Sequence, residues 1–237
     1  MRMLVLAGGF GTRLKAVVND VPKALAPIGG IPFLHLQIEN WIKQGVSSFV
    51  FLLHHQAGLI INFLQEEREG MLKGREVTWV VEQTPMDTGG AVAYAVRELQ
   101  LDGHFLVTNA DTWLGDGIAQ IFKSATPAMA VIHRDNVSRY GQVHFDTTGQ
   151  ISAFTEKGAS VEPGWINAGL CHLDADLFAD WDGQAFSLER STFVALVQAC
   201  RMTAVPLQTD FIDIGIPDDY YRFSQWVEKG RQVPLCN

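Results

Sequence analysis

The sequence is poor in cysteine. Its 237 residues contain only Cys171, Cys200 and Cys236, and no two of them have the C-x-x-C spacing of a zinc or redox motif. An odd number of scattered cysteines also cannot form a complete disulfide framework. The sequence therefore suggests neither a disulfide framework nor a zinc site, and we expect a reducing, cytoplasmic location.

Long hydrophobic runs are absent as well. The longest apolar runs, "FVFLL" (49–53) and "GLIINFL" (58–64), are far shorter than the ~20 residues that span a bilayer. The apolar stretch within "MRMLVLAGG" (1–9) is too short for a secretory signal. We therefore expect a chain without a membrane partner.

Positive charge is scarce overall but concentrated near the start of the chain. The sequence has 18 Lys and Arg against 26 Asp and Glu, a net charge of −8. This balance argues against a protein that binds nucleic acid through a broad basic face. Residues 1–25 reverse it, because Arg2, Arg13, Lys15 and Lys23 face only Asp20. Such a cluster indicates either a site for a small anion or an ordinary solvated basic edge.

What the sequence does contain is a regular alternation of strand and helix patterns. Short apolar runs that are typical of buried strands lie at 3–7, 48–53, 77–83 and 104–110. Helical patterns lie between them, at 33–45, 59–67 and 90–99. This alternation predicts an α/β fold with a Rossmann-like, mostly parallel mixed sheet flanked by helices. Ligands of such sheets bind beyond the carboxyl ends of the strands.

The pattern changes after residue 127. Strand-like runs at 128–133, 141–146, 149–156 and 165–174 are separated by turns, and "DTTGQ" (146–150) is typical of a hairpin connection. We expect these runs to add an antiparallel subregion to the parallel sheet. A final helix is predicted from Pro217 to Lys229, followed by Gly230. No linker-like stretch divides the chain, so we expect a single domain over 1–237.

The stretch "LAGGFGTRL" (6–14) is the first candidate ligand loop. A strand, glycines and a helix also outline the dinucleotide-binding fingerprint, but Leu14 stands where that motif needs its third glycine. The second strand also ends in "LLHHQ" (52–56), without the acidic residue that holds a ribose. The G-K-[ST] ending of a P-loop is missing too. An arginine inside the loop and Lys23 beyond it favour a highly charged anion such as a triphosphate.

Together with "DVPKALAPIGGIPFL" (20–34), this loop closely resembles the start of the sugar-1-phosphate nucleotidyltransferases, also called nucleotide-sugar pyrophosphorylases. The resemblance covers nearly the whole chain. It implies the nucleotide-diphospho-sugar transferase fold, with a nucleotide-binding part at about 1–126 and a sugar-binding part at about 127–237. It also implies that the loop wraps a nucleoside triphosphate while Arg13 and Lys23 face the phosphates.

The resemblance implies a set of nucleotide-binding residues. "VEQTPMDTGGAVAYA" (81–95) matches the family segment that contacts the base, although Asp87 departs from the glycine often found there. Whether Glu82 or Gln83 faces the base depends on the phase of the strand, which the sequence leaves open. The expected nucleotide-binding residues are Leu6, Ala7, Gly8, Gly9, Gly11, Thr12, Arg13, Glu82, Gln83, Thr88, Gly89, Gly90 and Asp111, and the expected catalytic residues are Arg13, Lys23 and Asp111.

Two aspartates are the expected metal ligands. By resemblance, Asp111 of "VTNADTW" (107–113) and Asp213 of "FIDIGIPDDY" (211–220) bind a divalent cation that bridges the phosphates. Two carboxylates suit Mg²⁺, which usually takes one or two protein carboxylates beside substrate phosphates. Taken alone, a strand-end aspartate is more often a helix cap or a turn residue.

The sugar side is expected at "RYGQV" (139–143), "TEKG" (155–158) and "WINAGL" (165–170). By resemblance, Gly141, Glu156 and Asn167 meet the sugar hydroxyls, and Lys157 meets the sugar phosphate. Adjacent residues of a regular strand face opposite ways, so Glu156 and Lys157 share a pocket only if the strand ends or bulges there.

The resemblance implies transfer of a nucleoside monophosphate from an NTP to a sugar 1-phosphate, with release of pyrophosphate. "FGTRL", "DTGGA", "FSLE" (186–189) and "FIDIGIP" look most like the short D-glycero-D-manno-heptose 1-phosphate guanylyltransferases, with mannose 1-phosphate guanylyltransferases next. We therefore expect GTP as the nucleotide and a product that serves surface-glycan synthesis, such as lipopolysaccharide or capsule.

Other functions stay open at this point. They are a uridylyl- or other nucleotidyltransferase acting on a different sugar 1-phosphate, a non-catalytic nucleotide-sugar-binding regulatory protein, and a glycosyltransferase of related fold. The sequence also leaves open whether the chain forms a homo-oligomer.

Overall fold

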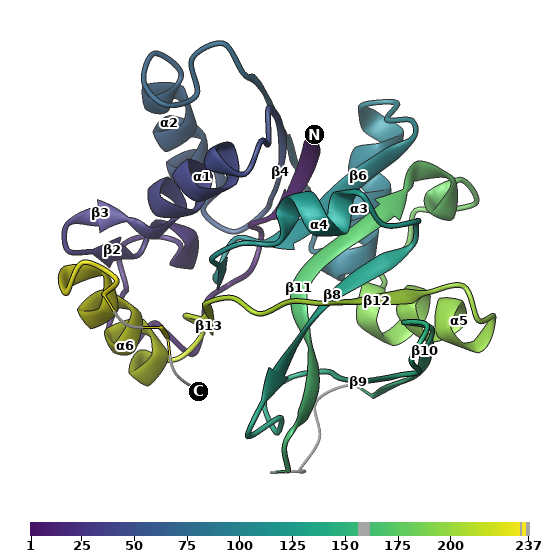
Figure 1. The fold of residues 1–237 in the computed structure, drawn as a ribbon. Coiled ribbons are helices and arrows are strands. Elements are labelled where there is room, and N and C mark those ends of the chain that lie inside the picture. The colour runs from purple at the N-terminus through teal and green to yellow at the C-terminus, as the bar shows by residue number, and fades with distance from the viewer. Residues whose placement is uncertain (156–161, 233, 236–237) are drawn as a thin grey trace.

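A nine-stranded mixed sheet forms the centre of the molecule (Figure 1). The computed structural model describes residues 1–155, 162–232 and 234–235. Seven strands follow the order β10-β9-β11-β6-β1-β4-β5, and β8 and β12 join the sheet through β11. The predicted α/β class, a mostly parallel sheet with antiparallel strands added, is confirmed.

The parallel half of the sheet contains the four strands that the sequence pattern predicted. β1 pairs in parallel with both β4 and β6, and β4 pairs in parallel with β5. Because these strands run the same way, their carboxyl ends meet at one edge of the sheet, where ligands bind in such folds. The bounds are β1 Arg2–Leu6, β4 Ser48–Leu53, β5 Glu76–Val81 and β6 His104–Asn109.

The antiparallel half is built on one long strand, β11 (Gly164–Asp174). It pairs with β6 through its C-terminal part, with β8 along most of its length and with β9 at Ile166, so the second half of the chain joins the same sheet. Asp146 and Gln150 close the predicted hairpin between β9 and β10. The remaining bounds are β8 Ala128–Arg134, β9 Gln142–Phe145, β10 Ile151–Thr155 and β12 Thr203–Pro206.

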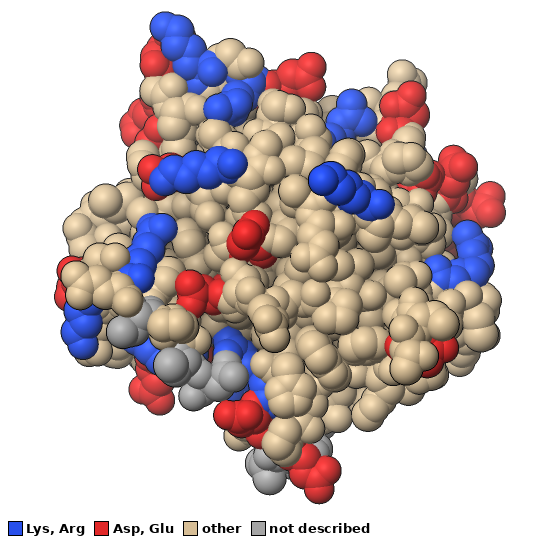
Figure 2. Space-filling view, in the orientation of Figure 1, with Lys and Arg blue, Asp and Glu red and all other residues tan. Residues whose placement is uncertain are grey.

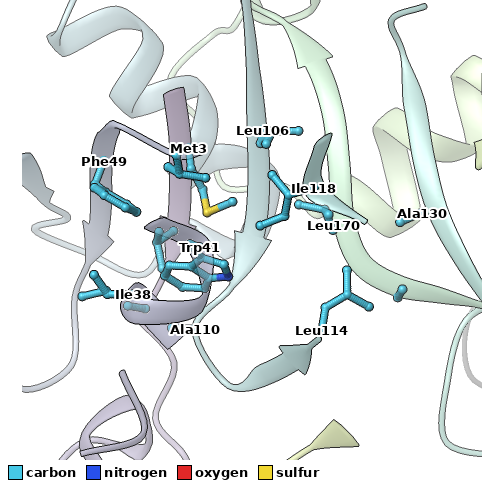
Figure 3. Close-up of a cluster of buried hydrophobic side chains, with 14 of the residues drawn as sticks. Met3, Ile38, Trp41, Phe49, Leu106, Ala110, Leu114, Ile118, Ala130 and Leu170 are labelled. Carbon is cyan, nitrogen blue, oxygen red and sulfur yellow. The ribbon is translucent and has the colours of Figure 1, made fainter. Parts of the chain in front are cut away.

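Helices cover both faces of the sheet because the central strands are apolar on both faces. Phe49 of β4 packs on the side where Trp41 of α1 also lies (Figure 3). Phe51 belongs to the same cluster, and Val50 and Leu52 pack on the other side. The side of Trp41 carries α1 (Phe33–Lys43), α2 (Ala57–Glu67) and α4 (Ile118–Phe122), and the opposite side carries α3 (Asp87–Glu98) and α5 (Phe193–Gln198).

A third apolar cluster fastens the C-terminal helix α6 (Pro217–Glu228) beside the N-terminal segment. Phe223 and Trp226 of α6 pack on Trp113, and Phe223 also meets Phe33 of α1. Two small sheets lie next to this cluster (Figure 1). They are β2 (Pro27–Ile28) with β3 (Ile31–Pro32), and β7 (Thr112–Leu114) with β13 (Phe211–Asp213).

Several short elements had no counterpart in the sequence prediction. They include the small-sheet strands, β12 and three helical turns: η1 (Lys23–Leu25), η2 (Ala175–Phe178) and the π-helical η3 (Leu188–Thr192). Each spans five residues or fewer, which is less than the length over which hydrophobic periodicity identifies an element.

The face in Figure 2 carries acidic and basic side chains interspersed, mostly around its margin, and no broad basic field. Among the described residues, no helix is long and apolar enough to cross a membrane.

Candidate active site

A cavity of about 450 Å³ opens at the carboxyl ends of β1, β4 and β6. The glycine loop that follows β1 forms one wall, and Asp111, Thr112 and Asp213 form another. Its lining residues from the predicted nucleotide set are Leu6, Ala7, Gly8, Gly9, Gly11, Arg13, Glu82, Thr88 and Asp111. Thr12, Gln83, Gly89 and Gly90 belong to the predicted set but do not line it.

Two glycines of the loop, Gly8 and Gly11, lie close to neighbouring segments. A Cβ on Gly8 would lie 3.1 Å from the Cβ of His54, which follows β4. Gly11 has a φ of +59°, in the left-handed region that glycine tolerates best, and a Cβ there would lie 3.2 Å from the Cβ of Lys23. The loop therefore folds tightly over Lys23 and leaves the cavity open above Gly9.

Lys23 lies between the two predicted metal ligands. Its ammonium forms an ion pair with Asp111, and Asp213 Oδ1 lies 3.8 Å from the same Nζ. The antiparallel pairing of β13 with β7 sets Asp213 opposite Thr112, the residue after Asp111. Three charged residues far apart in the sequence thus meet at one end of the cavity.

The two carboxylates differ in their affinity for a proton. Burial alone would raise the pKa of Asp111, but the charge of Lys23 and its hydrogen bond outweigh burial and hold that pKa below its ordinary value. Burial and the charge of Asp111 raise the pKa of Asp213. Two carboxylates beside one ammonium leave a net negative charge, which a cation would neutralise.

The donor set fits a magnesium ion that arrives with a phosphate ligand. Among the residues that the structure describes, no group of three or more Asp, Glu, His or Cys side chains could hold a metal. Two converging carboxylates match the number that Mg²⁺ usually takes from protein when phosphate oxygens and water complete its shell.

The sequence left open which of the two residues after β5, Glu82 or Gln83, faces the cavity, and in the structure it is Glu82. Glu82 is 7% exposed and lines the cavity, whereas Gln83 is exposed and does not. Met86 N–H donates to Glu82 Oε2 at 2.8 Å. Burial raises the pKa of Glu82, although this hydrogen bond opposes the rise.

The start of α3 is occupied by another part of the same chain. The backbone N–H groups of Gly89 and Gly90 both donate to the carbonyl of Phe186, at 2.9 and 3.0 Å. A Cβ on Gly89 would lie only 2.2 Å from the Phe186 ring. These two glycines thus allow the segment around Phe186 to pack against the start of α3. The sequence prediction did not include this structural role. Their predicted contact with a nucleotide stays a prediction.

A second cavity of about 290 Å³ adjoins the first on the side of the antiparallel strands. Gly141 and Asn167, both predicted on the sugar side, line it. The carbonyl of Gly141 accepts a hydrogen bond from Asn167 N–H at 2.9 Å. Glu156 and Lys157, the other two predicted sugar-side residues, lie outside the described residues.

The structure adds residues that the sequence prediction missed. Asn109 and Glu189 line both cavities, and Arg139 lines the second, where it forms an ion pair with the buried Asp219. Asn109 stands in the quoted "VTNAD", two residues before Asp111, and Glu189 ends the quoted "FSLE". The signal was therefore in the motifs, but only the fold shows that these side chains reach the cavities.

The fold and the site define a class: an α/β protein whose strand-end cavity, with a glycine loop, a lysine and paired carboxylates, suits a phosphorylated ligand. The chain belongs to the nucleotidyl transferase family, whose model matches residues 2–230.

Curated relatives and solved structures support this assignment. The chain is 29% identical over 228 residues to the D-glycero-alpha-D-manno-heptose 1-phosphate guanylyltransferase of Campylobacter jejuni, covering 94% of this chain and 98% of that one. It is 30% identical to mannose-1-phosphate guanylyltransferase 1 of Arabidopsis thaliana, over 93% of this chain and 63% of that protein. HddC from Yersinia pseudotuberculosis, crystallised with GMP-PN, superimposes with a TM-score of 0.80 at 29% identity, over 95% of this chain and 99% of that one.

Proposed function

We propose that this chain transfers GMP from GTP to the phosphate of a heptose or mannose 1-phosphate, releasing pyrophosphate and forming a GDP-sugar. The observation that carries the proposal is the meeting of the two cavities. They share five lining residues, among them Asn109, Glu189 and Asp213. Ligands bound in the two cavities would lie next to each other where Asp213 stands.

The choice of guanine rests on Glu82 and on the relatives. Guanine presents two adjacent N–H donors on its pairing edge, and a carboxylate can accept both. Glu82 Oε2 already accepts from Met86 N–H, but Glu82 Oε1 has no hydrogen-bond partner among the described residues. The names of the Campylobacter and Arabidopsis relatives, both guanylyltransferases, favour the same base.

The reaction is a direct displacement at phosphorus. An oxygen of the sugar 1-phosphate attacks the α-phosphorus of GTP, and the bond from that phosphorus to the oxygen bridging the β-phosphate breaks, so pyrophosphate leaves. Both reactants are anions, so the protein has to hold them together and balance their charge. Arg13 and Lys23 line the cavity as cations. We assign Arg13 to the leaving group and Lys23 to the phosphates under attack.

Asp111 and Asp213 would hold Mg²⁺. The ion, when bound, supplies charge neutralisation between the phosphates of the two substrates. The ammonium of Lys23 lies against the same carboxylates. If a cation bound to them, that ammonium would become available to the phosphates. We further propose a cytoplasmic enzyme that supplies GDP-sugar for surface-glycan synthesis.

The proposal is tested by measuring pyrophosphate release. The purified chain is incubated with Mg²⁺, each common NTP, and a panel of sugar 1-phosphates that includes mannose and D-glycero-D-manno-heptose. We expect release with GTP and a manno-configured sugar, and loss of release when EDTA removes the metal. Release with another NTP alone would contradict the choice of base. Tight binding of a GDP-sugar without any release would instead favour a non-catalytic regulatory protein.

A further inference from the structure

Glu189 occupies an unusual place between the two cavities. It lies in η3, which follows Phe186 and packs against the start of α3. Its neighbours Ser187 and Arg190 line only the second cavity, whereas Glu189 lines both. The side chain therefore stands at the junction, on the segment that forms the wall of the sugar-side cavity.

Within residues 1–155, 162–232 and 234–235, only one oxygen of the Glu189 carboxylate accepts hydrogen bonds. Thr88 Oγ1 donates to Glu189 Oε2 at 2.6 Å, and Ser187 Oγ donates to the same oxygen at 2.8 Å. Each hydroxyl has one proton, so these bonds commit both donors to Oε2. Among the described residues, Glu189 Oε1 has no hydrogen-bond partner. The two hydroxyls hold the carboxylate in place and leave one oxygen for a ligand.

The neighbouring charges decide what kind of ligand suits that oxygen. Within the described part of the chain Glu189 has no ion-pair partner, because the adjacent Arg190 is paired with Asp87 at 2.6 Å. An unpaired carboxylate repels a phosphate group. It is a good acceptor for a neutral hydroxyl, and a hydrogen bond to a charged group contributes more than one between neutral groups.

We propose that Glu189 is a specificity residue that accepts a hydrogen bond, at Oε1, from a ring hydroxyl of the sugar 1-phosphate. Thr88 and Ser187 are its positioning residues. The proposal rests on the proposed function and goes beyond it, because it assigns recognition of the sugar ring to a segment that is separate from Gly141 and Asn167.

The test compares the binding of two ligands that differ only in the sugar. Isothermal titration calorimetry measures the dissociation constants of GDP-mannose and of GDP for the wild type, Glu189→Ala, Glu189→Gln and the surface control Glu69→Gln. We expect Glu189→Ala to weaken GDP-mannose by about tenfold or more, as for loss of a hydrogen bond to a charged group. GDP should bind within about twofold of the wild type, and Glu69→Gln should change neither constant.

Other outcomes overturn the proposal. Equal weakening of GDP and GDP-mannose would mean that Glu189 meets the ribose or only supports the fold, and unchanged binding of GDP-mannose would mean that it meets neither sugar. Glu189→Gln keeps an acceptor oxygen for Thr88 and Ser187. It therefore replaces Glu189→Ala in the binding test if the alanine variant unfolds at a lower temperature than the wild type. Pyrophosphate release by the wild type tests the proposed function separately, because these binding constants do not depend on turnover.

Discussion

Lys23 links the glycine loop to the paired carboxylates at one end of the cavity. Its ammonium lies between Asp111 and Asp213, and its Cβ lies directly beneath Gly11 of the glycine loop. A larger residue at Gly11 would have to displace this lysine stem. The loop, the lysine and the two carboxylates thus form one interdependent unit rather than four separate motifs.

Arg13 is the second cation of this unit, and it lines the same cavity from an exposed position. We predict that Arg13→Ala lowers kcat by about 10²-fold, the effect of removing one preorganised electrostatic contact from a transition state. Steady-state pyrophosphate release measures this change.

The matched control for Arg13 is Arg201→Ala. Arg201 is exposed and lines none of the cavities described above. The kcat of the Arg201→Ala variant should stay within about twofold of the wild type, because a distant exposed charge acts only through screened, long-range interactions. Near-normal turnover by Arg13→Ala would show that Arg13 does not stabilise the transition state.

At the scale of elements, the contact between α3 and the segment at 186–190 joins the two cavities. Phe186 N–H donates to the carbonyl of Met86 at 3.1 Å, and the Phe186 carbonyl accepts from Gly89 and Gly90. Two free N–H groups at the start of α3, those of Gly89 and Gly90, are therefore satisfied by a segment from the other half of the sequence. This contact also sets Glu189 against Thr88.

We predict that Gly89→Ala destabilises the protein by about 1–3 kcal/mol, because the new Cβ would overlap the Phe186 ring. Urea unfolding measures the change in the free energy of unfolding. GDP-mannose binding should weaken as well, since the segment that carries Glu189 is displaced.

Gly58→Ala is the control for the glycine substitution. Gly58 lies in α2, and no atom of the described residues lies within 4 Å of the Cβ that alanine would add. Alanine is favoured over glycine in helices by about 0.5–1 kcal/mol, so this variant should be more stable than the wild type. If Gly89→Ala were equally stabilising, the close packing against Phe186 would be wrong.

At the scale of the whole molecule, stability should depend on pH through His172. This residue of β11 is 3% exposed, and its Nδ1 lies 3.1 Å from the Ser124 carbonyl. In the described part of the chain its Nε2 has no hydrogen-bond partner. Burial lowers the pKa of His172, although the hydrogen bond to Ser124 opposes that effect.

The direction of the effect follows from proton binding. In the unfolded chain His172 titrates near its ordinary value of about 6.5, whereas the folded protein resists that proton. Stability is therefore unaffected by His172 above pH ~6.5 and falls as the pH drops below it, by at most about 1.4 kcal/mol per pH unit, until the folded pKa is reached. The free energy of unfolding, measured by urea at a series of pH values, should show this slope.

His172→Phe keeps a ring against Phe122 but cannot bind a proton. We expect its stability to vary less between pH 7 and pH 5 than that of the wild type, whatever its absolute value. His144→Gln, at an exposed position, is the control. An unchanged slope in His172→Phe would show that other groups cause the pH dependence.

Much of the fold was predictable because the pattern that identifies a helix or strand lies in residues that are close together in the sequence. β4 was predicted at its observed bounds, and the other long strands and helices within a few residues, because hydrophobic periodicity is a local property. The antiparallel subregion was predicted too, but not that β11 would bind it to β6 in the same sheet. Strand order depends on contacts between distant segments, which local periodicity does not contain.

The sequence by itself determined the family resemblance, the α/β class and the position of the glycine loop, since each follows from residues close together in the chain. The tertiary structure decided that Glu82 rather than Gln83 lines the cavity, that Lys23 lies between Asp111 and Asp213, and that Glu189 meets Thr88. These contacts join segments that only the order of strands in the sheet brings together. The burial, charge neighbours and hydrogen bonds of a carboxylate depend on all of these segments.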